Sequence, residues 1–322
     1  MSKSRRPQAP ARTPHPRATK RVHHSPVVRA TTRDWIAGAR LRTLPLAIAP
    51  VALGTGIGIF EGGTMPWRPV NAVLALLVGL CLQIGVNFAN DYSDGIRGTD
   101  AYRVGPKRLT GSGAAQPARV RSVAFAFFGL AALAGLVLVI LTQFWWLLAV
   151  GVLAIAAAWF YTGGKRPYGY AGLGEVVVFL FFGLVATVGS AWVQSDIWLS
   201  QPALVAGSGV GLLACAVLMA NNLRDIEQDA LAGKRTLAVR LGSLGSRIVF
   251  ALFMLLPFGA LWFLSLTIPA AGIAYFVLLM AIPAAVIVLW SRTAQELIWA
   301  LQLASFSALA YGLSVGLAFA FA

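Results

Sequence analysis

The sequence predicts an all-α integral membrane protein, and three observations lead to this fold class. Of the 322 residues, 58% are hydrophobic and 11% are charged, which excludes both an ordinary soluble domain and a disordered chain. The hydrophobic residues form runs of about 20, the length with which an α-helix crosses a bilayer. Helices and closed barrels alone satisfy their own backbone in lipid, and the alternating pattern of a barrel strand is absent. We therefore expect a bundle of transmembrane helices.

Residues 1–33 form a basic segment that we expect to be a disordered cytoplasmic tail. They combine Pro, Arg, Ser and Thr with few large apolar residues, so they cannot bury enough surface to fold. The segment lacks the apolar core of a secretory signal, which predicts that the first span remains in the mature protein. A single membrane domain is then expected over residues 34–322, with Trp35 to Arg42 at the membrane interface.

Nine apolar runs predict nine transmembrane helices. Two boundaries are inferred from length, because the runs 122–161 and 248–290 are each too long for one crossing; the first is divided at 142–143 and the second near 267–269. The predicted spans are 44–60, 70–89, 122–141, 144–161, 173–193, 203–222, 247–267, 271–290 and 298–321.

The distribution of basic residues predicts the orientation of these helices in a cell membrane. Eleven of the 26 Lys and Arg precede Leu44, and nearly all the others fall in loops on the same side of the membrane as the N-terminus. Only Arg68 falls on the opposite side, so the positive-inside rule predicts a cytoplasmic N-terminus. The net charge of +15 therefore predicts that the basic loops and tail contact anionic membrane lipid, and we expect no nucleic-acid partner.

Two acidic stretches at span ends are the main functional signal. Six of the eleven Asp and Glu fall within 91–100 and 225–229, after the second and sixth spans, on the predicted cytoplasmic side. Acids beside a membrane are costly and predict a functional site. Two sets follow the spacing of one helix face: Asn87, Asn90, Asp91 and Asp94 in the first stretch, and Asn221, Asp225 and Asp229 in the second.

The residue types in these stretches favour magnesium and a phosphorylated substrate. All three histidines lie in the tail, so a metal site in the membrane body must use oxygen ligands. Mg²⁺ is usually held by a few carboxylates together with substrate phosphates. The neighbouring loops offer cations for those phosphates: Arg103, Lys107, Arg108, Lys165, Arg166, Lys234 and Arg235. A single cation in such a loop is more often a topology signal, and a single Asn or Asp at a helix end is often a cap.

These motifs resemble those of the UbiA superfamily of membrane prenyltransferases. The resemblance covers nearly all of the chain from Trp35 onward and implies nine helices around a central cavity. Gly98 stands where many members carry a third acid, and the roles of Asp100 and Glu175 stay open. Three motifs carry the likeness: NDYSD at 90–94, the set Asn221, Asp225 and Asp229, and YTGGKR at 161–166.

Four further segments are similar to the branch of this superfamily that prenylates 1,4-dihydroxy-2-naphthoate. They are NDYSDGIRGTD, GPKRLTGSG, GLGEVVVFLFFG at 172–183 and ARLRTLP at 39–45. The likeness implies a polyprenyl diphosphate donor, Mg²⁺ as cofactor and 1,4-dihydroxy-2-naphthoate as the acceptor. The acceptor would lose its carboxyl group as CO₂, giving demethylmenaquinone in menaquinone biosynthesis.

The resemblance also implies roles for individual residues. Mg²⁺ and cationic side chains would stabilise the departing diphosphate, and the allylic cation would then alkylate the naphthoate ring. The prenyl chain length, the oligomeric state and the proton acceptor stay open. The metal ligands would be Asp91, Asp94, Asp225 and Asp229, and the diphosphate would be bound by Asn87, Asn90, Lys107, Arg108, Tyr161, Lys165 and Asn221.

Two alternatives to this function stay open, and a third is rejected. A prenyltransferase acting on another aromatic acceptor, such as 4-hydroxybenzoate, would need the same acids. An ion-coupled transporter would place its acids on broken helices near the bilayer midplane, whereas these acids lie at span ends. A CDP-alcohol phosphotransferase is rejected on spacing. In that class the two pairs of acids lie within about one helix hairpin, whereas here Asp225 and Asp229 lie more than a hundred residues after Asp91 and Asp94.

Overall fold

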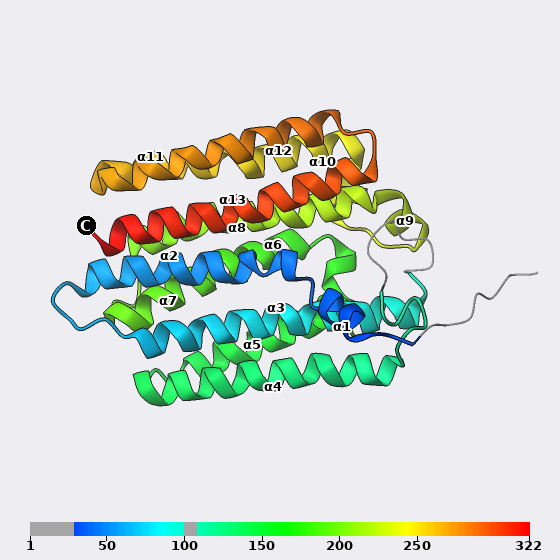
Figure 1. Cartoon of the computed structure of the whole chain (residues 1–322), viewed down its shortest axis with the longest axis horizontal. Coiled ribbons are helices and arrows are strands. Elements are labelled where there is room, and N and C mark those ends of the chain that lie inside the picture. Colours follow the sequence, from blue (N-terminus) through cyan, green and yellow to red (C-terminus); the bar gives the residue numbers. More distant parts are fainter. Residues whose placement is uncertain (1–28, 100–107) are drawn as a thin grey trace, which may run out of the picture.

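The computed structural model describes residues 29–99 and 108–322 as a bundle of helices that run side by side along its longest axis (Figure 1). The described part contains no strand. Its elements are α1 (Thr32–Gly38), η1 (Leu41–Thr43), α2 (Pro45–Gly62), α3 (Pro69–Arg97), α4 (Pro117–Thr142), α5 (Leu147–Phe160), η2 (Tyr168–Ala171), α6 (Gly174–Val178), η3 (Phe179–Val185), α7 (Ala186–Ser195), α8 (Gln201–Arg224), α9 (Ile226–Leu231), α10 (Leu237–Leu255), α11 (Pro257–Thr267), η4 (Pro269–Val277), α12 (Leu278–Trp290) and α13 (Ala294–Ala320).

The nine predicted spans all correspond to helices within the described ranges. Eight helical stretches there are long and apolar enough to cross a membrane, and α5, with 14 residues, is a ninth and shorter apolar helix. Three of the eight join consecutive elements: α6, η3 and α7; α10 and α11; η4 and α12. Both divisions inferred from length are confirmed, since α4 ends at Thr142 and α11 at Thr267. This is the organisation of a multi-pass membrane protein.

The helix α3 extends beyond its predicted end at residue 89. It continues to Arg97 and ends at Gly98, which adopts the left-handed conformation with φ 72°. Glycine takes this conformation without a Cβ clash and so commonly terminates helices. The first acidic stretch is therefore inside a helix, where Asp91 and Asp94 are buried.

The centre of the bundle is formed by α2, α8 and α13, which pack closely on one another. A Cβ at Gly56 of α2 would lie 1.9 Å from the carbonyl oxygen of Gly316 of α13, so only glycine fits this crossing. In contrast, α5 has no buried residue and packs on α3 and α4 at the periphery. The closely packed centre therefore lies beside a less buried flank.

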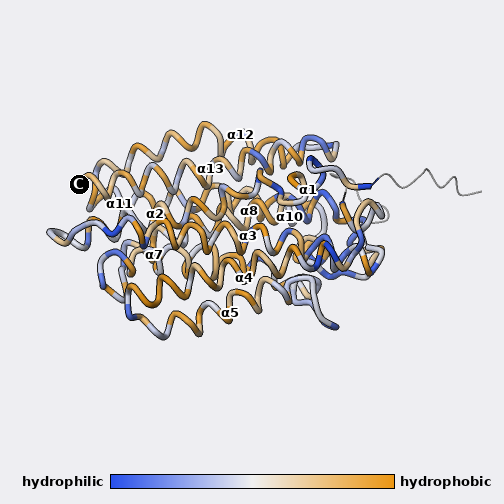
Figure 2. Tube along the Cα trace, turned by 60° about the horizontal axis from the view of Figure 1, so that its bottom comes forward, coloured by the Kyte–Doolittle hydropathy of each residue, from blue (hydrophilic) through white to orange (hydrophobic). Residues whose placement is uncertain are grey.

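Hydrophilic residues concentrate at the end of the bundle where α1 lies, while the long helices are mainly hydrophobic (Figure 2). The acidic stretch of α3 is at that end, and Arg68, at the other end of α3, pairs with Asp196 after α7. Which end faces the cytoplasm stays a prediction from charge. Residues 1–28 of the predicted tail lie outside the described residues, and α1 begins at Thr32.

Candidate active site

Both acidic stretches open onto one cavity of about 660 Å³. Its walls come mainly from α2 to α8, with further residues from η1, α9 and the loops at one end, and one residue from α13. The predicted site residues that line it are Asn87, Asn90, Asp94, Arg108, Tyr161, Asn221, Asp225 and Asp229. The structure therefore brings together two stretches that are far apart in the sequence, as the sequence predicts.

Asp94 contacts donors from three other segments of the chain. It is 4% exposed, and its Oδ1 accepts a hydrogen bond from the Tyr170 hydroxyl at 2.5 Å. Lys234 Nζ lies 3.5 Å from the same oxygen, and Arg108 Nη2 lies 3.4 Å from Oδ2. Burial and the Asp94 carboxylate raise the pKa of the Tyr170 phenol, which keeps this group protonated as a donor. Three donors from three loops thus converge on one carboxylate.

Asp229 reaches the same cation from the other stretch. Its Oδ1 lies 3.3 Å from Lys234 Nζ, and the ammonium also lies 4.7 Å from the centre of the Tyr170 ring. Burial raises the pKa of Asp229, while the positive charge of Lys234 opposes that rise. Lys234 therefore joins α3, α9 and the loop before α6 at the polar end of the cavity.

Asp225 follows the last residue of α8 and is held by the residue before it. Arg224 donates from Nε and Nη2 to the two carboxylate oxygens of Asp225 at 2.8 and 2.6 Å. The same Nη2 donates to Oδ1 of Asn221 at 2.9 Å. Arg224 is only 6% exposed, so this is a buried two-pronged ion pair that fixes the direction of the second acidic stretch.

The two predicted asparagines of α3 join that helix to its neighbours. Asn87 Nδ2 donates to the Ala39 carbonyl at 3.0 Å and to Thr43 Oγ1 at 3.2 Å. Asn90 Oδ1 accepts from Thr162 Oγ1 at 2.7 Å. These bonds position the segment between α1 and α2 and the loop after α5 around the cavity.

Asp91 faces away from the cavity. Its Oδ2 accepts the N–H of Leu109 at 2.9 Å and its Oδ1 accepts the N–H of Thr110 at 2.8 Å. The side chain is 2% exposed and is not one of those that line the cavity. Both carboxylate oxygens are thus engaged by the loop that precedes α4.

The other predicted site residues, and the two acids whose roles the sequence left open, lie in different places. Tyr161 lines the cavity just after α5. Lys165 is exposed and is not one of the cavity-lining residues. Lys107 and Asp100 lie outside the described residues. Glu175 is buried behind the wall, where its Oε1 accepts from Asn222 Nδ2 at 3.1 Å.

Three contacts at this site were not predicted from the sequence: the Tyr170 donor, the Arg224 pair and the Asn222 amide that lines the cavity. A tyrosine in a short loop has the pattern of an interfacial aromatic, and Arg224 has that of a topology signal. The adjacency of Arg224 to Asp225 was a usable signal, because a buried charge needs a partner.

The carboxylates of the cavity fit a hard cation only if a substrate adds oxygens. Within residues 29–99 and 108–322, no group of three or more His, Cys, Asp or Glu side chains could hold a metal ion alone. Asp94, Asp225 and Asp229 nevertheless line one cavity, and each of them offers carboxylate oxygens as metal ligands. Mg²⁺ is typically held by one or two carboxylates plus phosphates, so this open set fits Mg²⁺ with a diphosphate.

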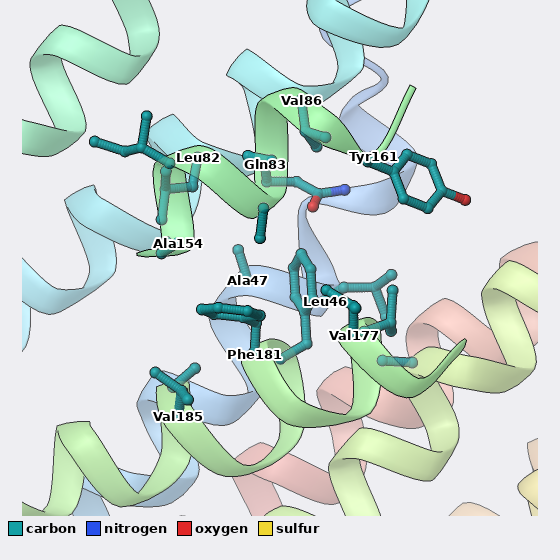
Figure 3. Close-up of a pocket in the computed structure, with 18 of the residues that line it drawn as sticks. Leu46, Ala47, Leu82, Gln83, Val86, Ala154, Tyr161, Val177, Phe181 and Val185 are labelled. Atoms are coloured by element: carbon teal, nitrogen blue, oxygen red, sulfur yellow. The ribbon is translucent and has the colours of Figure 1, made fainter. Parts of the chain in front are cut away.

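The rest of the cavity is apolar and is enclosed by facing helices. Figure 3 shows Leu82 and Val86 of α3 on one side, opposite Val177 and Phe181 of the α6–η3 segment, with Leu46 of α2 beside them. An apolar cavity with a few polar groups at one end suits an amphiphilic ligand with an anionic head.

Comparison with known families agrees with this geometry. The model of the UbiA prenyltransferase family matches residues 47–320. The chain belongs to the UbiA prenyltransferase family. A Mycobacterium tuberculosis relative named 1,4-dihydroxy-2-naphthoate octaprenyltransferase is 47% identical over 293 residues, which cover 91% of this chain and 98% of the relative.

Solved structures of UbiA homologues confirm the fold. The apo structure of a homologue from Aeropyrum pernix superposes with a TM-score of 0.64 at 14% identity, covering 84% of this chain and 96% of that one. A homologue from Archaeoglobus fulgidus, bound to DMAPP and Mg²⁺, gives a TM-score of 0.58 at 15% identity and covers 85% and 98%. The all-helical UbiA fold that the motifs predict is therefore present here.

Proposed function

We propose that the chain transfers a polyprenyl group from polyprenyl diphosphate to 1,4-dihydroxy-2-naphthoate. CO₂ and diphosphate are lost, and the immediate product is the quinol form of demethylmenaquinone. A separate two-electron oxidation, by an oxidant outside this protein, then gives demethylmenaquinone, an intermediate of menaquinone biosynthesis. The observation that carries this proposal is a cavity in which three acids lie near Arg108 and Lys234 at one end, with apolar walls beyond them. The 47% identity to a relative named for this acceptor supports the choice of acceptor.

We assign the polar end of the cavity to the diphosphate and Mg²⁺. Asp94, Asp225 and Asp229 would hold Mg²⁺, which supplies positive charge to the departing diphosphate. Lys234 and Arg108 would donate to diphosphate oxygens as negative charge builds up on them. The Tyr170 hydroxyl and the Arg224 guanidinium keep Asp94 and Asp225 in fixed orientations while this happens.

We assign the apolar part of the cavity to the prenyl chain. Cleavage of the donor C–O bond leaves its electron pair on diphosphate and an allylic cation in the cavity. Side chains such as Val86, Val177 and Phe181 exclude the water that would otherwise capture this cation. The electron-rich ring of the acceptor then forms the new carbon–carbon bond. The acidic end of the bundle, which also carries nearly all the Lys and Arg of the described residues, would face the cytoplasm.

Incubation of the purified protein with a labelled prenyl diphosphate and either dihydroxynaphthoate or 4-hydroxybenzoate tests this function. We expect a prenylated, decarboxylated naphthoate product by mass analysis, with equimolar diphosphate release that stops when Mg²⁺ is chelated. Asp94→Asn should lower both sharply, and a higher Mg²⁺ concentration should restore part of the rate. Prenylation of the benzoate alone would show that the acceptor is wrong, and solute transport without any product would favour the transporter.

A further inference from the structure

The loop 108–116, before α4, is packed tightly on α3. Leu109 is 3% exposed and packs in a cluster with Phe88 and Val120. A Cβ at Gly95 of α3 would lie 2.4 Å from Cγ2 of Thr110, so the helix and the loop touch with no room for another methyl group. The position of the loop is therefore determined by its contact with α3.

Asp91 provides polar contacts of this interface. Its two carboxylate oxygens accept the N–H groups of Leu109 and Thr110 at 2.9 and 2.8 Å, in a site from which water is excluded. Hydrogen bonds to an ionised acceptor are roughly twice as strong as those between neutral groups. Loss of the carboxylate would also leave two buried N–H groups without this acceptor.

The same contact determines where Arg108 lies. Arg108 directly precedes the two anchored residues, lines the cavity and has its Nη2 3.4 Å from Oδ2 of Asp94. Asp91 and Asp94 lie three residues apart on α3, yet Asp94 faces the cavity and Asp91 faces the loop. Two neighbouring carboxylates of one motif thus contact different partners.

We propose that Asp91 is a positioning residue that holds residues 108–110 on α3 and so keeps the Arg108 guanidinium at the diphosphate end of the cavity. The identity of the ligand rests on the proposed function, whereas the loop contact does not. Asp91 then controls donor binding through Arg108, a role different from the metal ligand that the motif predicts.

Amide hydrogen exchange of the full-length protein, measured without substrate, tests the contact itself. Asp91→Asn keeps the size of the side chain but replaces one acceptor oxygen by a donor, and Gly95→Ala pushes on Thr110 from the same helix. Both variants should speed exchange at Leu109 and Thr110, while Asp94→Asn should not. Unchanged exchange at these two amides in both variants would overturn the proposal. Gly95→Ala also provides the test should Asp91→Asn fail to fold.

Kinetics of the same variants separate positioning from metal binding. Asp91→Asn and Gly95→Ala should each raise the KM for prenyl diphosphate about tenfold, with the Mg²⁺ concentration for half-maximal rate unchanged. Asp94→Asn should instead raise the Mg²⁺ requirement. A Mg²⁺ requirement in Asp91→Asn as high as in Asp94→Asn would make Asp91 a metal ligand. If loop exchange rises in the variants while the wild type releases no diphosphate, the contact is supported and the proposed function is defeated.

Discussion

Asp94 of α3 and Asp229 of α9 share one ammonium group, because Lys234 Nζ lies 3.5 Å from the first carboxylate and 3.3 Å from the second. The two acidic stretches are thus joined through a cation that is 11% exposed at its side chain. A diphosphate entering between them would find this donor already in place. Preorganised donors of this kind stabilise charge that develops during a reaction.

Replacement of Lys234 should lower turnover far more than replacement of Lys165, the lysine of the YTGGKR motif. Lys234→Met should lower kcat/KM for prenyl diphosphate about a hundredfold, since it removes a buried donor to the leaving group. Lys165→Met is the matched control, and we expect it to stay within about twofold because Lys165 is exposed and outside the cavity lining. Steady-state diphosphate release measures both. The reverse order of effects would assign the role to Lys165.

Arg224 should be required for stability as well as for activity. Arg224→Met removes the two-pronged partner of Asp225, and breaking a buried ion pair costs about 3–5 kcal/mol. We expect a clear fall in the thermal unfolding temperature in detergent. Asp225→Asn in the Arg224→Met background should restore part of the stability, because the carboxylate charge is then gone, but it should restore no activity. If Asp225→Asn changes the unfolding temperature by the same amount with Arg224 present as in the Arg224→Met background, the two side chains are not coupled.

The width of the apolar cavity should limit the length of the prenyl chain that the protein accepts. Ala154 of α5 lines the cavity (Figure 3), about 10 Å along the helix from Tyr161 at the polar end. Ala154→Phe should reduce kcat/KM for a long polyprenyl diphosphate about tenfold, a loss on the scale of 1.4 kcal/mol, and that for geranyl diphosphate much less. Ala156→Phe, on the same helix but not in the cavity lining, is the control. An equal loss for both donors would indicate a general packing defect.

Much of the fold follows from the length of the apolar runs, since each predicted span is a helix. The π-helical segment η3 could not be predicted, because it depends on close packing against α8. A Cβ at Gly183 of η3 would lie 2.8 Å from the Gly207 carbonyl oxygen and 2.8 Å from Gly211 Cα. Such three-dimensional contacts leave no trace in the hydrophobic pattern.

The acids of the candidate site could be predicted from the sequence, but the lysine that contacts them could not. Charge cost and helical spacing identify the acids, because few carboxylates occur in so apolar a chain. Which loop cation turns inward depends on how the loops pack. Arg235 donates its N–H to the Tyr170 carbonyl at 2.8 Å, which joins two loops and brings the neighbouring Lys234 over the Tyr170 ring. Lys165 carries the same charge, and its sequence context gives no sign that it stays outside.

The pair formed by Arg68 and Asp196 at the other end of the bundle should give a measurable pH dependence of stability. Two hydrogen bonds, at 2.6 and 2.5 Å, join the guanidinium to the carboxylate, and they hold the pKa of Asp196 below its usual value of 3.8. A carboxyl group with a lowered folded pKa stabilises the protein at pH values above 3.8, and this contribution is lost as the pH falls through the lowered pKa.

Asp196→Asn should therefore lower the unfolding temperature slightly at neutral pH, and the difference from wild type should shrink as the pH falls below about 4. The side chain is 43% exposed, so the pair contributes about 1 kcal/mol or less and weakens in salt. Asparagine suits the left-handed conformation of this residue, so the variant tests the charge and not the backbone. In an Arg68→Gln background, Asp196→Asn should have no further effect, and a persisting effect would assign the stabilisation to another partner.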